Sequence, residues 1–80
     1  MNINELQQEL QALGYPPAAY SIGLDRDESY CLVPSSAGWH VYYSERGNCN
    51  EERVFTVEDE AGRELLSRLH RDRSVRPGNG

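Results

Sequence analysis

Residues 38–47 read G-W-H-V-Y-Y-S-E-R-G, and this stretch decides the predicted fold. It contains the only tryptophan of the 80-residue chain and is bounded by a glycine at each end. Successive side chains of a β-strand point to opposite faces, so the stretch divides into two sets. The more apolar set, which we expect to face a core, consists of Trp39, Val41 and Tyr43. The opposite set consists of His40, Tyr42 and Ser44. We therefore predict that this stretch forms the central strand of a small sheet.

Three further strands are predicted, two before this stretch and one after it. Larger apolar residues alternate with small ones over 20–24, which predicts a half-buried strand with Leu24 on its core face. Two more runs predict strands at 29–34 and 51–56, and Pro34 ends the ladder of the first of these. Short polar turns separate the four runs, so we expect neighbouring strands to pair as an antiparallel meander.

An amphipathic helix is predicted over residues 2–13, where an apolar residue recurs every three or four positions. The apolar stripe consists of Ile3, Leu6, Leu10 and Leu13. Asn2 or Asn4 can cap the start of the helix, and Gly14 suits its C-terminal end. The stripe could be the seam of a dimer, but a stripe of about two heptads is more often the core face of a packed helix.

A second helix is predicted after Thr56, which suits the N-cap position, with Asp59 completing a weak capping box. Its first turn is acidic and its last turn is basic, as the helix dipole favours. The predicted buried stripe consists of Val57, Ala61, Leu65, Leu66 and Leu69.

These elements predict an α+β fold, an antiparallel meander of three to four strands with the N- and C-terminal helices packed on one face. We expect one domain over residues 1–73 and a disordered basic tail over 74–80. The other face of the sheet is then partly bare. The residues expected on it are Ser21, Cys31, Val33, His40, Tyr42 and Val54.

The charge of the chain is unevenly distributed. The formal net charge is −5, from 13 acids and 8 bases, and all the bases are arginines. Residues 1–64 hold 12 acids and 4 arginines, or −8, and residues 65–80 hold 4 arginines and one acid, or +3. An acidic body repels phosphate backbones, so we expect no nucleic-acid partner. The charge suits binding to a basic protein surface, and the alternative is that it only keeps the protein soluble.

Export, membrane insertion and metal binding are not indicated. The first ten residues contain no apolar run of the signal-peptide kind, and no stretch approaches membrane length, so we expect a cytoplasmic protein with no membrane partner. Cys31 and Cys49 are expected to be free thiols in a reducing compartment, with a disulfide possible only across neighbouring strands. There is no C-x-x-C pair or Cys/His cluster, so we expect no metal and no cofactor.

No constellation of catalytic residues is evident in the sequence, so we expect a protein that is not an enzyme. A nucleophile could be imagined from either cysteine with His40, but no spacing supports it. A helix, a three-strand meander and a helix is also the layout of a double-stranded-RNA-binding domain, which grips phosphates with lysines at its last helix. Here that helix begins with V-E-D-E, residues 57–60, whose charge has the wrong sign for RNA.

Protein recognition is the expectation that these observations leave. A bare sheet face with tyrosine and histidine, ringed by acids, could supply contact area and steer a basic partner. The predicted partner-binding residues are Asp25, Asp27, Glu28, His40, Tyr42, Glu45, Glu51 and Glu52.

The motifs W-H-V-Y-Y-S-E-R-G (39–47) and R-V-F-T-V-E-D-E-A-G-R-E-L-L-S-R-L (53–69) resemble a pattern in small bacterial immunity proteins of polymorphic toxin systems, the contact-dependent inhibition and Rhs types. The resemblance implies a cytosolic protein that binds a cognate toxin domain, one with a basic cleft, and blocks its active site or the approach of its substrate. It carries over no interface residue. The alternative is an acidic adaptor or regulatory module that binds another basic protein or homodimerises through its open sheet.

Overall fold

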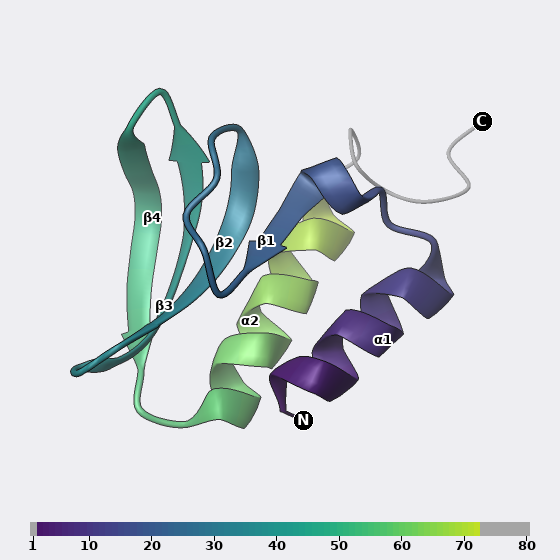
Figure 1. Ribbon diagram of the computed structural model, residues 1–80, viewed down its shortest axis with the longest axis horizontal. Helices are drawn as coiled ribbons and strands as arrows, with labels where there is room; N and C mark the ends of the chain where they lie inside the picture. Colours follow the sequence, from purple (N-terminus) through teal and green to yellow (C-terminus); the bar gives the residue numbers. More distant parts are fainter. Residues whose placement is uncertain (1, 73–80) are drawn as a thin grey trace.

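The computed structural model describes residues 2–72 and shows two helices and a four-stranded sheet (Figure 1). In chain order the elements are α1 (Ile3–Leu13), the 3₁₀ helix η1 (Pro17–Ala19), β1 (Tyr20–Ile22), β2 (Ser29–Ser35), β3 (Gly38–Glu45), β4 (Asn48–Phe55) and α2 (Glu58–Arg71). The predicted α+β class, with a helix at each end of the strands, is confirmed. The predicted tail over 74–80 lies outside the described residues.

The sheet is mixed, with the strand order β1-β2-β3-β4. Strands β2, β3 and β4 form the predicted antiparallel meander, whereas β1 pairs with β2 in parallel, with Tyr20 opposite Tyr30. The expectation that every neighbouring pair is antiparallel is therefore wrong for β1. Parallel neighbours usually need a crossover of a dozen or more residues. Here β1 has only three residues, so the connection 23–28 is long enough to return the chain to the start of β2.

A β-bulge interrupts the pairing of β3 with β4. Val41 pairs with Arg53 and Tyr43 pairs with Asn50, so β4 contains one more residue than β3 between these two pairs. Glu51 lies in this interval and has a φ of 55°, in the left-handed region. Such bulges increase the local twist of a strand and re-aim its side chains.

The first helix is capped as its sequence predicts, and the second is not. Asn2 and Glu5 form a reciprocal capping box, and Gly14 ends α1 in the left-handed conformation. The N-cap of α2 is Val57, without a side-chain cap, so the predicted cap by Thr56 is wrong. Within residues 2–72, neither helix has the length and apolar character needed to cross a bilayer.

The starts of the two helices are joined by one hydrogen bond. The Ile3 N–H donates to the Glu58 carboxylate over 2.7 Å. A helix leaves its first N–H groups without a partner inside the helix, and the negative charge of Glu58 also suits the positive end of the α1 dipole. The first residue of α2 thus completes the first turn of α1.

The core lies between one face of the sheet and the two helices, which are on the same side of it (Figure 1). Its fully buried members are Leu6, Leu10, Leu32, Val41, Ala61, Leu65 and Leu69. Because Leu6 and Leu10 are buried within the monomer, the stripe of α1 is core and not a dimer seam. Three residues predicted to be buried are exposed: Leu13, Leu24 and Val57. Leu13 is the last residue of α1, Leu24 lies beyond the end of β1, and Val57 precedes α2.

Candidate functional site

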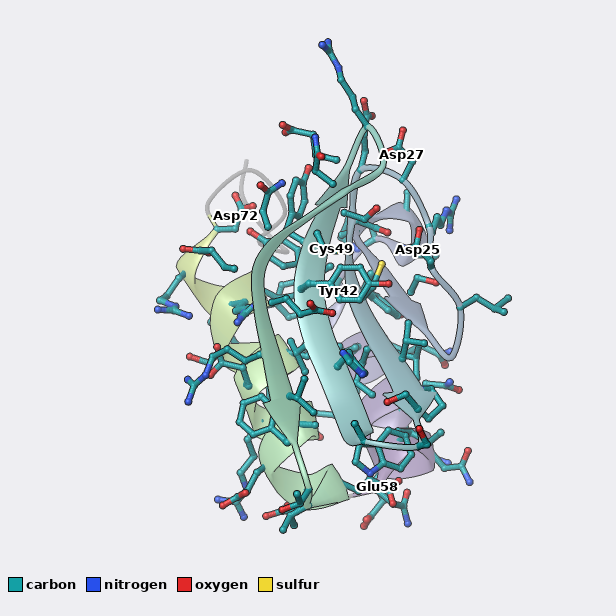
Figure 2. All side chains as sticks on the ribbon, turned by 90° about the vertical axis from the view of Figure 1, so that its left-hand side faces the viewer. Asp25, Asp27, Tyr42, Cys49, Glu58 and Asp72 are labelled. Carbon is teal, nitrogen blue, oxygen red and sulfur yellow. The ribbon has the colours of Figure 1, made fainter. Side chains whose placement is uncertain are left out.

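The face of the sheet turned away from the helices is partly covered by the loop 23–28 (Figure 2). Tyr42 lies under this loop and is only 5% exposed, and its hydroxyl donates to a carboxylate oxygen of Asp25 over 2.6 Å. The expectation that Tyr42 lies on a bare face is therefore wrong. Burial raises the pKa of the Tyr42 hydroxyl, and the hydrogen bond to Asp25 raises it further. Its observed contact is with the chain's own loop.

Further hydrogen bonds hold the loop in place. The Ser29 hydroxyl donates to the Arg26 carbonyl over 2.8 Å, and the Arg46 N–H donates to the Asp27 carboxylate over 2.6 Å. The Ser44 hydroxyl adds a longer contact of 3.5 Å to Asp25. The loop is thus fastened both to β2 and to the β3–β4 turn.

This arrangement gathers acids at the end of the sheet where β3 meets β4. We call Asp25, Asp27, Glu28, Glu45 and Glu51 the acidic end. With Arg26 and Arg46, the loop 23–28 and residues 45–51, which span the β3–β4 turn and the strand ends beside it, carry five acids and two bases, a formal charge of −3. Glu28, Arg46 and Glu51 all have positive φ, so the backbone turns sharply at each.

Tyr30 packs against the core, and its ring contacts that of Tyr43 with the centroids 4.8 Å apart. Burial raises the pKa of Tyr43, and nearby carboxylates including Glu45 and Glu28 raise it further. Burial also raises the pKa of Tyr30, whose hydroxyl donates to Asp72 over 2.8 Å. Four carboxylates of the acidic end thus raise the pKa of one or other of these tyrosines: Glu45, Glu28 and Asp27 that of Tyr43, and Glu51 that of Tyr30.

The other two predicted site residues form a separate pair on the open face. His40 Nδ1 lies 2.9 Å from a carboxylate oxygen of Glu52, and His40 Nε2 lies 2.7 Å from the hydroxyl of Ser35. The His40 side chain is 24% exposed and that of Glu52 is 42% exposed. The structure therefore divides the eight predicted residues into the acidic end, the His40–Glu52 pair and the buried Tyr42. Ser35 had no distinguishing signal in the sequence, because it belongs to the S-S-A-G run (35–38) that predicts a turn, whereas in the structure it is the last residue of β2.

A groove of about 650 Å³ runs between β4 and α2. Its residues are Tyr30, Glu51, Glu52, Arg53, Glu64, Arg68, Arg71 and Asp72. Arg68 is buried; it donates to Glu64 over 2.7 Å and to the Val41 carbonyl over 3.3 Å. The sequence placed Arg68 only among the bases of the last helical turn, whereas it ties α2 to the central strand.

Both cysteines are free, and they do not lie on neighbouring strands. Cys31 is buried on β2 and Cys49 is exposed on β4, with β3 between them. Among the described residues, no group of three His, Cys, Asp or Glu side chains is placed to hold a metal ion.

Comparison with known proteins adds no relative: no family model, curated protein or solved structure matches the chain.

Proposed function

We propose that this chain is a cytosolic immunity protein, which neutralises a cognate bacterial toxin domain by tight stoichiometric binding through the acidic end. The observation that carries the proposal is the set of five carboxylates at one end of the sheet, two of them in hydrogen bonds that hold the loop 23–28. The resemblance of residues 39–47 and 53–69 to immunity proteins supplies the class of partner.

The charge of the acidic end suits a basic cleft. Complementary charge accelerates encounter and disfavours wrong partners more than it adds affinity. Affinity also needs apolar contacts that become buried in the complex. Leu24, which is 74% exposed, directly precedes Asp25 in the same loop and can provide such a contact. Because the loop is already held in place, little conformational entropy would be lost on binding.

Co-expression tests the class of function. The chain is expected to protect cells from the toxin domain encoded beside its own gene and to co-purify with that domain. Cells that are killed despite soluble expression of both proteins, with no complex recovered, would contradict the proposal.

Charge neutralisation tests the surface. Glu28→Gln with Glu45→Gln removes two acids whose side chains make no hydrogen bond within residues 2–72. At low salt the association rate should fall by roughly 3- to 10-fold and should become less sensitive to salt. The matched control is Glu9→Gln with Glu60→Gln, which removes the same charge from exposed helix positions. Equal association rates for the two double variants would place the interface elsewhere.

The alternative is an acidic adaptor that homodimerises or binds another protein through its open sheet. Strand β4 is an edge strand and is exposed over most of its length, which favours this alternative. The bulge at Glu51 and the charged run Glu51-Glu52-Arg53 oppose it, because both features discourage pairing between edges. Light scattering tests it: a stable dimer that is lost on substitution of Val54 would support the alternative.

A further inference from the structure

Three side chains on neighbouring strands form a continuous hydrogen-bonded chain on the open face. Ser35 ends β2, His40 lies near the start of β3 and Glu52 lies in β4. The Ser35 hydroxyl oxygen is 2.7 Å from His40 Nε2, and His40 Nδ1 is 2.9 Å from Glu52. Each imidazole nitrogen thus has its own partner, a hydroxyl on one side and a carboxylate on the other.

These partners determine where the protons lie in the neutral form of His40. The Glu52 carboxylate can only accept, so Nδ1 carries the proton and donates it to Glu52. Nε2 then has a free lone pair, and the Ser35 hydroxyl donates to it. The Ala37 N–H donates to the same hydroxyl oxygen over 3.1 Å. The serine proton has two acceptors, His40 Nε2 at 2.7 Å and the Gly38 carbonyl at 3.4 Å, and the imidazole is the nearer of the two.

We propose that Ser35 is a nucleophile for small activated esters, with His40 as its general base and Glu52 as the residue that positions His40. A hydroxyl, an imidazole that accepts its proton and a carboxylate that orients the imidazole are the parts that activate serine. Ser35 is exposed at the end of its strand, so an unhindered acyl group can reach it from solvent. This inference is independent of toxin binding, which was assigned to the acidic end.

The reaction proceeds in two balanced steps. Ser35 Oγ forms a bond to the carbonyl carbon while its proton moves to His40 Nε2, and the ester C–O bond breaks as the alcohol leaves with that proton. Water then attacks the acyl-serine, gives its proton to His40 and releases the carboxylic acid. The bond between the acyl carbon and Ser35 Oγ breaks in this step, and the imidazole passes the proton taken from water to Ser35 Oγ.

Labelling with an alkyl fluorophosphonate tests the nucleophile. Attack by Ser35 forms a P–O bond and breaks the P–F bond, and the serine proton leaves with fluoride. Peptide mapping by mass spectrometry then compares Ser35 with Ser36, the adjacent exposed serine in the same turn. We expect Ser35 to label selectively, and His40→Gln to slow this labelling by about 100-fold. His40→Asn serves as a second variant, and circular dichroism verifies that both variants fold.

Two results would overturn the proposal. In one, Ser35 labels no faster than Ser36; in the other, folded His40→Gln and His40→Asn label as fast as the original chain. Either result would mean that the three side chains only fasten the turn between β2 and β3.

The tautomer of the His40 ring distinguishes a positioning role of Glu52 from a purely structural one. The ¹⁵N shifts of the His40 ring report which nitrogen carries the proton. We expect Nδ1–H in the original chain and a larger share of Nε2–H in Glu52→Gln, together with slower labelling of Ser35. An unchanged ring spectrum in Glu52→Gln would remove Glu52 from the proposal.

Discussion

Replacing Tyr42 by phenylalanine would remove one hydroxyl and leave the rest of the buried ring in place. That hydroxyl donates to Asp25 over 2.6 Å and links the central strand to the loop 23–28. The ring itself is 5% exposed, so its packing against the sheet is expected to persist. The substitution therefore isolates the contribution of one hydrogen bond to the position of the loop.

The expected cost follows from the nature of the two partners. A hydrogen bond to a charged group contributes about 1.5–3 kcal/mol to the free energy of unfolding. Asp25 is exposed, so water can solvate its carboxylate once the hydroxyl is gone, and the lower end of the range applies. We expect Tyr42→Phe to lower the free energy of unfolding by about 1.5 kcal/mol, or Tm by roughly 6–12 °C for a domain of this size.

Urea unfolding followed by the fluorescence of Trp39 measures this cost. Tyr20→Phe is the matched control, because Tyr20 is half-buried and its hydroxyl makes no hydrogen bond within residues 2–72. A double-mutant cycle with Asp25→Asn should show coupling between the two sites. A loss no larger than in Tyr20→Phe, or additive effects in the cycle, would refute the view that this bond holds the loop.

Three further outcomes are expected. Gly38→Ala should lower the free energy of unfolding by about 2–4 kcal/mol, because φ is +135° and an added Cβ would meet the Phe55 carbonyl. Gly47→Ala, at φ +82° in open space, should lower it by only about 1 kcal/mol, and equal losses for the two variants in thermal unfolding would contradict this. Leu65→Ala should cost about 2–5 kcal/mol and the exposed Leu24→Ala under about 0.5 kcal/mol in urea titrations. The free energy of unfolding should not depend on tyrosine ionisation below about pH 10 and should fall above it, by up to about 1.4 kcal/mol per pH unit for each tyrosine that keeps its proton in the folded state. A urea midpoint that stays constant from about pH 9 to 11 would contradict this. The tyrosines with raised pKa are Tyr30, Tyr42 and Tyr43.

Local patterns predicted the elements and the faces of the central strand. The leucine spacing of α1 and the glycine after it determined the helix and its end, and Leu6 and Leu10 are buried as the spacing requires. Alternation placed Val41 in the core and His40 on the opposite face, because each strand residue has only two faces to choose between.

Long-range placement could not be predicted in the same way. Periodicity does not specify the direction in which a short strand pairs, so the parallel pairing of β1 was missed. The charged loop 23–28 looked like a solvated turn, yet Asp25 satisfies the buried hydroxyl of Tyr42. The link between Ser35, His40 and Glu52 depends on the register of three strands, with a bulge in one of them, and no spacing along the chain specifies that register.

The bond between Ile3 and Glu58 has a consequence for the order in which the chain can fold. These residues are 55 positions apart, and α1 buries Leu6 and Leu10 in a core that includes Leu65 of α2. At roughly 5–20 residues per second, the ribosome would release the start of α1 seconds before its partner exists. An N-terminal fragment that stops before α2 therefore keeps the capping box of α1 but lacks the Glu58 carboxylate and the apolar side chains of α2 that complete the core around α1. The domain becomes stable only when nearly all of it has been synthesised.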